Sequence, residues 1–330
     1  MKAAMPPARP KVLYLSHATA DLYALIKDVA GDRFEVITLE RDDDDERCRR
    51  IADCDAVICA ATRLTKRHLD AAPKLRLVHH QGVGWQDTTD WQEIKRRGLP
   101  LAMTTAGTTI GVAEHTVLLM LAAAKRLAFA DAELRRGRWH VNALRGVSRE
   151  LYGKTIGYVG MGRIGQAVAE RLRAFGCCGI YVDPAIRLPS DEEARLGLRN
   201  GMLDEVLTAA DVLTLHVPLT ASTRGLIGRN EIARLKPGAI IVNTARGGLI
   251  DEAALVEALK SGHVLAAGLD VFESEPPPPG HPLLTLPNVV LTPHISAGTR
   301  DAMRQKMQAI FDNIEMFFTT GDLKNRVVFP

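Results

Sequence analysis

The chain has 330 residues, of which 46% are hydrophobic and 25% charged, and its formal net charge is +3. This length suits two domains of roughly 150 residues each. The balanced charge, without a basic stripe, argues against a nucleic-acid partner. The most apolar segment, Val117–Ala124, is flanked by charged residues and is too short to cross a bilayer, so we expect no membrane partner either.

Cysteine usage indicates a reducing compartment. The cysteines are odd in number and form no CxxC pair, and Met1–Pro10 lacks the long apolar core of a signal peptide. We therefore expect reduced thiols and a cytoplasmic location. The adjacent pair Cys177 and Cys178 offers a redox role, but we expect two small buried hydrophobic residues instead. The five cysteines are Cys48, Cys54, Cys59, Cys177 and Cys178.

The first hundred residues alternate short apolar runs with helix-like segments such as Ala20–Ala30 and Lys66–Ala72. Strands that alternate with helices indicate parallel βαβ units with a sheet buried on both faces. The acidic run Asp42–Glu46 is interpreted as a solvated loop or a helix start, and no further ligands lie at a spacing that would complete a metal site. We expect no metal in the chain. The predicted strands are Val12–Leu15, Phe34–Leu39, Ala56–Cys59 and Leu75–His79.

One long helix is predicted over Gly111–Arg136, and the strand–helix alternation then begins again. The repeated prolines of Pro276–Pro279 indicate a loop, because proline lacks the N–H donor that a helix or sheet needs. Gly298–Thr319 has apolar residues at helical spacing, from Met303 to Phe317. The second set of predicted strands is Thr155–Val159, Gly179–Val182, Val212–Leu215, Ile240–Asn243, Leu265–Leu269 and Val289–Leu291.

The strongest local motif is Gly160-x-Gly162-x-x-Gly165, which lies between a predicted strand and the predicted helix Gln166–Phe175. In a dinucleotide-binding turn, the first glycine permits the tight turn and the second lets the backbone approach a pyrophosphate at the helix N-terminus. The third allows the helix to pack closely on the strand.

The strand after this motif ends in Asp183, 18 residues beyond Gly165. A carboxylate at that position accepts hydrogen bonds from a ribose diol and repels a 2′-phosphate, so we predict NAD as the cofactor, with Arg187 as the one feature that softens the exclusion of NADP. The fold class is therefore α/β, with two doubly wound parallel-sheet domains. We expect a Rossmann NAD-binding domain over residues 108–297, inserted into a flavodoxin-like substrate domain of residues 1–107, to which a C-terminal helix in 298–330 returns.

Three residues of suitable chemistry each follow a predicted strand of the inserted domain: Arg246, Glu275 and His294. Ligands of open α/β sheets bind beyond the carboxyl ends of the strands, so all three residues can face one crevice. Reduction of a 2-keto acid needs a proton donor, which His294 supplies near neutral pH. A carboxylate such as Glu275 favours imidazolium and orients the ring, and a guanidinium such as Arg246 grips carboxylate and keto oxygens.

With these motifs, the sequence resembles the D-isomer-specific 2-hydroxyacid dehydrogenase family over nearly its whole length. The likeness is carried by the glycine turn, Val112-Ala113-Glu114-His115, His216–Thr220, Asn243–Asp251 and Pro293-His294. The resemblance implies Arg246, Glu275 and His294 as catalytic residues, and a homodimer built around the Gly111–Arg136 helix. It also implies cofactor contacts from Arg163, Ile164, Asp183, Val217, Pro218, Thr223, Thr244, Ala245 and Asp270, beside Gly160, Gly162 and Gly165.

The family's carboxylate-binding loop resembles Gln81-Gly82-Val83-Gly84-Trp85, in which the N–H groups of Val83 and Gly84 would bind the substrate carboxylate. The following residues are one longer than the family pattern, and Thr105-Ala106-Gly107 lacks its usual proline. Trp85 therefore either caps a larger, more apolar substrate pocket or packs the loop.

Two alternatives to a dehydrogenase of small 2-hydroxy and 2-keto acids stay open. A phosphite dehydrogenase resembles this family, but it has lysine in the anion loop where this chain has Val83. An NAD(H)-sensing corepressor-like scaffold on the same fold can keep Arg246, Glu275 and His294, and it would turn over every keto acid slowly. No appended interaction tail marks this chain as such a scaffold.

Overall fold

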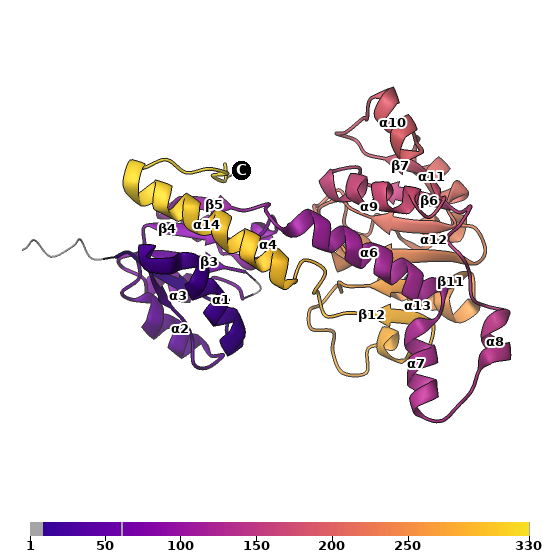
Figure 1. The fold of residues 1–330 in the computed structure, drawn as a ribbon, viewed down its shortest axis with the longest axis horizontal. Helices are drawn as coiled ribbons and strands as arrows, with labels where there is room; N and C mark the ends of the chain where they lie inside the picture. The colour runs from indigo at the N-terminus through magenta and orange to yellow at the C-terminus, as the bar shows by residue number, and fades with distance from the viewer. Residues whose placement is uncertain (1–8, 61, 330) are drawn as a thin grey trace, which may run out of the picture. The chain divides into compact units, whose positions relative to one another are not determined.

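The computed structural model describes residues 9–60 and 62–329, and the chain divides into two compact units. The first unit comprises Met1–Thr108 and Thr299–Pro330, and the second comprises Thr109–Gly298 (Figure 1). Each unit contains one parallel sheet covered by helices, which confirms the predicted α/β class. In the part of the chain that the structure describes, no helix is long and apolar enough to span a membrane.

The first unit contains a five-stranded sheet in the order β2-β1-β3-β4-β5. This is the flavodoxin-like order, in which the chain starts inside the sheet and turns in opposite directions from β1. Its strands are β1 (Lys11–Tyr14), β2 (Glu35–Ile37), β3 (Ala56–Cys59), β4 (Leu77–His80) and β5 (Leu101–Met103).

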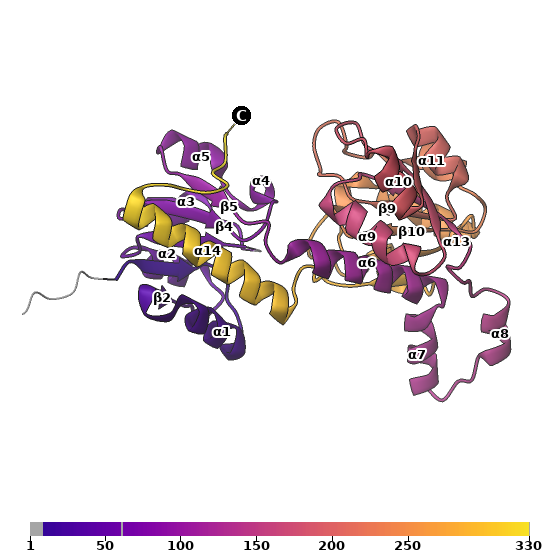
Figure 2. The same ribbon diagram turned by 45° about the horizontal axis from the view of Figure 1, so that its top comes forward.

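Helices cover both faces of this sheet, because successive strand residues point to opposite sides. Val12 and Tyr14 pack with α1 and α14, whereas Leu13 packs in the other core with α2 and α5. The C-terminal helix thus belongs to the first unit, as Figure 2 shows. The helices are α1 (Ala20–Ala30), η1 (Gly31–Arg33), α2 (Asp44–Ile51), α3 (Lys66–Asp70), α4 (Trp85–Thr88), α5 (Trp91–Arg96) and α14 (Arg300–Thr320).

The second unit contains a seven-stranded sheet in the order β12-β11-β10-β9-β6-β7-β8. From β6 the chain runs first to β7 and β8, then crosses back to β9, as in the Rossmann order. The strand order therefore reverses between β6 and β9. The strands are β6 (Thr155–Val159), β7 (Cys178–Val182), β8 (Leu198–Asn200), β9 (Val212–Leu215), β10 (Ala239–Asn243), β11 (Val264–Leu269) and β12 (Val289–Leu291).

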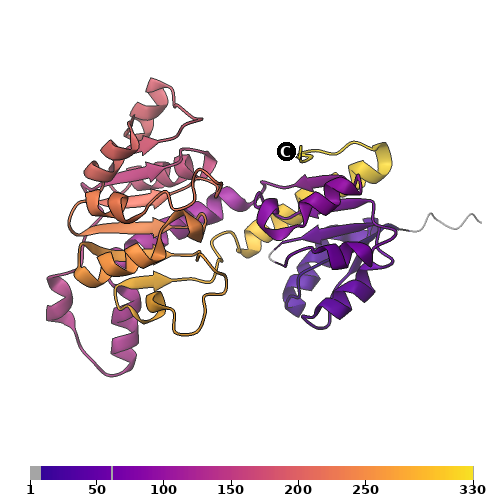
Figure 3. The same cartoon turned by 180° about the vertical axis from the view of Figure 1, so that it is seen from behind.

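Two apolar cores lie on the two faces of this sheet. Ile240 and Val242 pack with α6 and α9, whereas Ile241 packs with α11, α12 and α13. Figure 3 shows the second unit and its helices from behind. The helices are α6 (Thr108–Ala124), α7 (Leu127–Arg135), α8 (Val141–Arg145), α9 (Arg163–Arg173), α10 (Ser190–Leu196), α11 (Leu203–Ala209), α12 (Arg229–Arg234), η2 (Gly247–Leu249), α13 (Glu252–Ser261) and η3 (Pro282–Thr285).

Several sequence predictions need correction. The single helix expected over Gly111–Arg136 is two helices, because Arg126 adopts a left-handed conformation (φ 56°) between α6 and α7. The short edge strands β5 and β8 were not predicted. Cys177 is buried as expected, but Cys178, the first residue of β7, is exposed.

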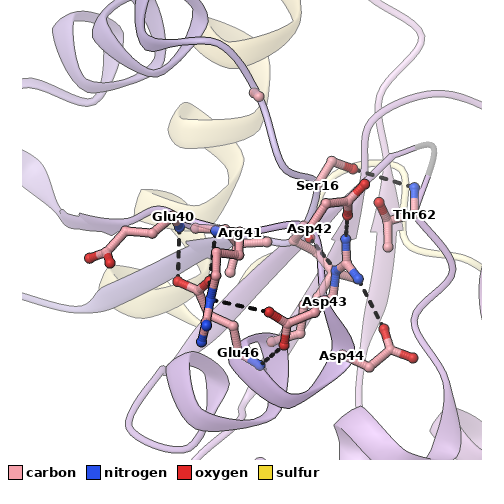
Figure 4. A network of polar contacts seen from close by, with 12 residues as sticks. Ser16, Glu40, Arg41, Asp42, Asp43, Asp44, Glu46 and Thr62 are labelled. Atoms are coloured by element: carbon pink, nitrogen blue, oxygen red, sulfur yellow. Dashed lines mark hydrogen bonds and ion pairs between the residues drawn. The ribbon is translucent and has the colours of Figure 1, made fainter.

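The acidic run Asp42–Glu46 is a helix start, and part of it is buried. Asp43 caps α2 by accepting the Glu46 N–H, and the Glu46 carboxylate accepts the N–H groups of Glu40 and Arg41 at 2.8 and 2.7 Å (Figure 4). These bonds hold the pKa of Glu46 below its ordinary value, with the N–H of Glu40 as the largest cause. Arg47 is buried beside the run, pairs with Asp42 and Asp44, and donates to the Leu15 carbonyl. Of the two interpretations offered for this run, the structure confirms the helix start, and Glu46 within it is buried.

Candidate active site

The three candidate catalytic residues follow three neighbouring strands. Arg246 comes after β10, Glu275 after β11 and His294 after β12, and these strands are adjacent and parallel in the sheet. Their carboxyl ends therefore meet at one edge, and the side chains lie beyond it. Gly247 brings two of these loops close together, since a Cβ on it would lie 1.9 Å from the Phe272 carbonyl carbon.

His294 and Glu275 are in direct contact. Nδ1 of His294 lies 2.7 Å from Oε2 of Glu275, and the other carboxylate oxygen accepts the Phe272 N–H at 3.1 Å. Because a carboxylate only accepts, Nδ1 carries the proton, and Nε2 is the ring atom left for another group. Burial raises the pKa of Glu275, but the hydrogen bond and charge of His294, the Phe272 N–H and the charge of Arg246 outweigh it and hold the pKa below its ordinary value.

The His294 loop is held by Asp270, which is fully buried. Its carboxylate accepts the N–H groups of Ile295 and Ser296, both at 2.9 Å, and the Thr292 hydroxyl at 2.7 Å. His115 on α6 lies 2.9 Å from the same hydroxyl. His294 itself has a positive φ of 52°, which these bonds around it stabilise.

Arg246 lies in a loop whose backbone is fixed by the buried Asn243. The Asn243 amide donates to the Arg246 carbonyl at 2.9 Å and accepts the Ala245 N–H at 3.0 Å. One guanidinium nitrogen of Arg246 donates to the Ala245 carbonyl at 2.7 Å. Its positive charge reaches Glu275, where it contributes to the lowered pKa of that carboxyl.

The glycine turn lies at the reversal of strand order, between β6 and α9. Gly160 has a φ of +100°, and a Cβ on it would lie 2.7 Å from the His216 backbone, so no other residue fits there. A Cβ on Gly165 would lie 2.5 Å from the Gly160 carbonyl oxygen. Gly162 has no atom within 4 Å of its Cβ position, which leaves open space beside the N-terminus of α9. This geometry fits a pyrophosphate at the turn.

Asp183 follows β7 and also holds the glycine turn in place. Its carboxylate accepts the Met161 N–H at 2.7 Å and the N–H groups of Ala185 and Ile186 at 2.8 and 3.0 Å. These three bonds leave acceptor capacity for one further donor, because two carboxylate oxygens offer about four lone pairs. The residue therefore fits a contact to one ribose hydroxyl.

The other predicted cofactor contacts lie along the same edge of the sheet. Val217 and Pro218 follow β9, and the Thr223 hydroxyl donates to the Pro218 carbonyl at 2.7 Å. Thr244 follows β10, and its hydroxyl lies 2.8 Å from that of Thr116 on α6. Arg163, Ile164, Ala245 and Asp270 complete the set at the start of α9 and after β10 and β11.

The candidate carboxylate loop belongs to the first unit and follows β4. Val83 is half-exposed, and within residues 9–60 and 62–329 the N–H groups of Val83 and Gly84 donate no hydrogen bond. Trp85 is 7% exposed and contacts Trp91 and Phe329, with ring centroids 6.1 and 5.9 Å away. Of the two roles considered for Trp85, the structure favours packing of the loop.

Sequence reasoning missed a second support of the catalytic loops. Glu252, at the start of α13, accepts the Glu273 N–H at 2.6 Å and pairs with His281 at 3.0 Å, so it braces the segment before Glu275. No local motif marks this pair, whose members are 29 positions apart in the sequence. Among the residues with described positions, no cluster of three or more His, Cys, Asp or Glu side chains suits a metal ion.

Comparison with known proteins identifies the family. Residues 117–296 match the model of the D-isomer specific 2-hydroxyacid dehydrogenase, NAD binding domain. The chain is 44% identical over 285 residues to D-3-phosphoglycerate dehydrogenase of Methanocaldococcus jannaschii, covering 86% of this chain and 53% of that protein. It is 44% identical over 272 residues to hydroxypyruvate reductase of Thermotoga maritima, covering 82% and 86%.

Among solved structures, the TT0316 protein of Thermus thermophilus superimposes with a TM-score of 0.83 at 34% identity, covering 96% of this chain and all of that one. The chain spans about half the length of the phosphoglycerate dehydrogenases it matches. The family match covers more than half of the chain, and the hydroxypyruvate reductase aligns along most of both sequences. The chain belongs to the D-isomer specific 2-hydroxyacid dehydrogenase family.

Proposed function

We propose that this protein is an NAD-dependent oxidoreductase that transfers a hydride between NAD(H) and C2 of a small D-2-hydroxy acid or its 2-keto acid. The observation that carries this proposal is the contact of 2.7 Å between His294 and Glu275, next to the charge of Arg246. A proton donor, its orienting carboxylate and a cation thus lie on the sheet edge that also carries the glycine turn.

The cofactor site fits NAD. Gly160, Gly162 and Gly165 shape the turn, with Arg163 and Ile164 at the start of α9, and Asp183 supplies a carboxylate toward the adenosine ribose. When bound, NADH supplies the hydride that reduces C2 of the keto acid. The further contacts that we propose come from Val217, Pro218, Thr223, Thr244, Ala245 and Asp270.

His294 acts as the acid in reduction and as the base in oxidation. Its Nδ1–H is committed to Glu275, so Nε2 faces the substrate oxygen and gives it a proton as C2 becomes tetrahedral. Glu275 keeps the ring in this orientation and stabilises its protonated form. In the reverse reaction, neutral His294 takes the proton of the C2 hydroxyl at Nε2.

Substrate anchoring falls to Arg246 and to the loop of Val83 and Gly84. The Arg246 guanidinium polarises the keto oxygen and binds a carboxylate oxygen through paired donors. The N–H groups of Val83 and Gly84, which have no acceptor in the described chain, bind the carboxylate. We assign residues 1–107 and 298–330 to the substrate domain and 108–297 to the NAD-binding domain.

The test is a panel of 2-keto acids (glyoxylate, hydroxypyruvate, pyruvate, phenylpyruvate and 2-ketoisocaproate) with NADH. We expect turnover of at least one acid by the wild type and its loss in His294→Ala, with NADH binding retained. A chain that binds NADH but reduces none of these acids would contradict the proposal. Phosphite with NAD serves as a control, on which we expect no turnover.

We also propose that two copies of the chain associate through the segment from α6 to α8. This segment exposes several large apolar side chains, among them Trp139 at 74% exposure, and α7 and α8 extend from the rest of the second unit (Figure 2). Light scattering should report a dimer, and Leu134→Lys with Trp139→Lys should give a monomer. The exposed large apolar residues from α6 to α8 are Ile110, Leu118, Leu127, Leu134, Trp139 and Val141. We propose the cytoplasm as the location of the protein, because all five cysteines are free thiols, which persist in a reducing compartment.

A further inference from the structure

His80, the last residue of β4, joins two points of the loop that follows it. Its Nδ1 lies 2.9 Å from the Gly82 carbonyl oxygen and its Nε2 lies 2.7 Å from the Thr88 hydroxyl. The imidazole is 4% exposed and packs against Gly82, where a Cβ would lie 3.7 Å from the His80 ring. The side chain therefore spans the loop from its start to the end of α4.

The chemistry of these partners places the ring proton. A carbonyl oxygen only accepts, so Nδ1 of His80 must carry a proton and donate it to Gly82. In the neutral ring, Nε2 is then an acceptor, and the Thr88 hydroxyl donates to it at 2.7 Å rather than to the Gly84 carbonyl, which lies 3.3 Å away. One tautomer thus satisfies both bonds, and a side chain with a single polar atom could satisfy only one.

Both ends of the bridge are attached to rigid structure. His80 pairs with Cys59 and Met103 in the sheet, and its carbonyl accepts the Thr104 N–H at 3.1 Å. The Thr88 carbonyl accepts the Leu64 N–H at 2.8 Å. Between these supports, the Gln81 N–H donates to the Cys59 carbonyl at 2.8 Å, whereas Gly82 has a φ of +147° and Val83 is half-exposed.

We propose that His80 and Thr88 are positioning residues that fix the direction of the Val83 and Gly84 N–H groups and so set the affinity for the substrate carboxylate. The inference rests on the proposed function, in which these two N–H groups bind that carboxylate. The fixed Gly82 carbonyl determines the plane of the next peptide, which contains the Val83 N–H. Preorganised donors bind an anion without the cost of ordering the loop.

Four variants separate the two bonds. Thr88→Val removes the hydroxyl and nearly keeps the shape, whereas Thr88→Ser keeps it. His80→Asn retains a donor at the position of Nδ1, and His80→Leu removes both bonds. Thr208→Val is the matched control, because the Thr208 hydroxyl on α11 of the second unit also lies beside the carbonyl four residues earlier, that of Asp204, but has no histidine partner.

The assay uses the keto acid that the wild type reduces fastest, together with its methyl ester. We expect Thr88→Val to raise KM for the acid about tenfold with a smaller change in kcat, since the loop binds ground state and transition state alike. His80→Leu should raise it further, Thr88→Ser should restore it, and Thr208→Val should leave it unchanged. The Kd of NADH should stay constant, and the preference for acid over ester should fall in the variants that raise KM.

An unchanged acid-to-ester preference in both Thr88→Val and His80→Leu would overturn the inference, provided that the wild type reduces the acid. An equal loss of affinity for acid and ester would overturn it too, because the bridge would then support the loop without acting on the carboxylate. If the wild type reduces no keto acid at all, the proposed function fails first, and the two failures are thereby distinguished. Thermal unfolding of each variant shows whether the first unit remains folded.

Discussion

Asp270 holds the turn of His294 through both its backbone and its side chain. The His294 N–H donates to the Asp270 carbonyl at 2.8 Å, and the Asp270 carboxylate holds the next two N–H groups, those of Ile295 and Ser296. A buried carboxylate thus organises the turn that carries the proposed acid. The contact to cofactor that the family resemblance implies for Asp270 would come in addition to this structural role.

Asp270→Asn should therefore reduce both stability and turnover. An amide presents one acceptor oxygen, so an N–H or hydroxyl partner loses its acceptor in a buried site, which costs about 1–3 kcal/mol. Urea unfolding measures this loss, and kcat should fall because the His294 turn is no longer fixed. Asp251→Ala, which removes the cap of α13, should cost about 1 kcal/mol without changing kcat. A full kcat in Asp270→Asn would show that the turn keeps its geometry without the carboxylate.

Arg246→Ala should weaken binding and turnover together. We expect a loss of roughly 2–4 kcal/mol in apparent barrier, or about 30- to 1,000-fold in kcat/KM, for a charge-assisted pair of hydrogen bonds. Arg246→Lys should restore little, because an ammonium cannot reproduce the two-pronged geometry. Steady-state kinetics with the preferred keto acid measures both variants, and near-wild-type kcat/KM in the alanine variant would remove Arg246 from the site.

Asp183 should determine the choice of cofactor. Its negative charge opposes a 2′-phosphate, so Asp183→Asn should lower the NADH-to-NADPH ratio of kcat/KM by about tenfold or more. Asp183→Ala should lower the ratio too, and should also raise the Kd of NADH, because the Met161 N–H loses its acceptor in the glycine turn. Equal use of both cofactors by the wild type would refute the assignment.

The sequence was sufficient to predict two parallel sheets and the strand that each candidate catalytic residue follows. Apolar runs of strand length and the glycine turn are local signals, which a sequence shows directly. It could not show the break at Arg126, where the amino-acid composition on both sides stays helical. It could not show β5 either, since this short strand is defined by its pairing with β4 and by hydrogen bonds to the distant residues Asn325 and Val327.

Contacts between segments that are distant along the chain could not be predicted from the sequence. His115 and Thr292 are 177 positions apart, and their hydrogen bond depends on how α6 packs on the sheet. Trp85 shows the same limit, because its neighbour Phe329 lies near the other end of the chain and decides that the ring is buried. Local composition alone left both roles of Trp85 open.

In the wild-type protein, the acid limb of the pH profile of reductive kcat/KM should lie at low pH. The pKa of Glu275 is lowered, so its carboxylate stays ionised below the ordinary glutamate value of about 4.3. Activity should then fall only as the pH drops through this lowered pKa, because protonated Glu275 no longer orients His294. Reductive kcat/KM measured from about pH 3 to 9 tests this, and an acid limb near pH 6 in the folded protein would contradict it.

Glu275→Gln removes the negative charge and nearly keeps the shape of the side chain. It therefore tests whether Glu275 stabilises the protonated form of His294 during turnover. Reduction needs protonated His294, and the glutamine variant holds that proton less tightly. The alkaline limb of reductive kcat/KM should therefore move to lower pH than in the wild type. Oxidation of the hydroxy acid needs neutral His294, so its activity should also appear at lower pH.

Both limbs must therefore shift in the same direction, which two independent titrations can measure. Glu273→Gln is the matched control. It removes the same charge at a position two residues before Glu275, where the side chain does not contact His294, so both limbs should stay in place. A reductive limb that stays fixed in Glu275→Gln, or moves to higher pH, would show that the contact of 2.7 Å does not stabilise the protonated ring during turnover.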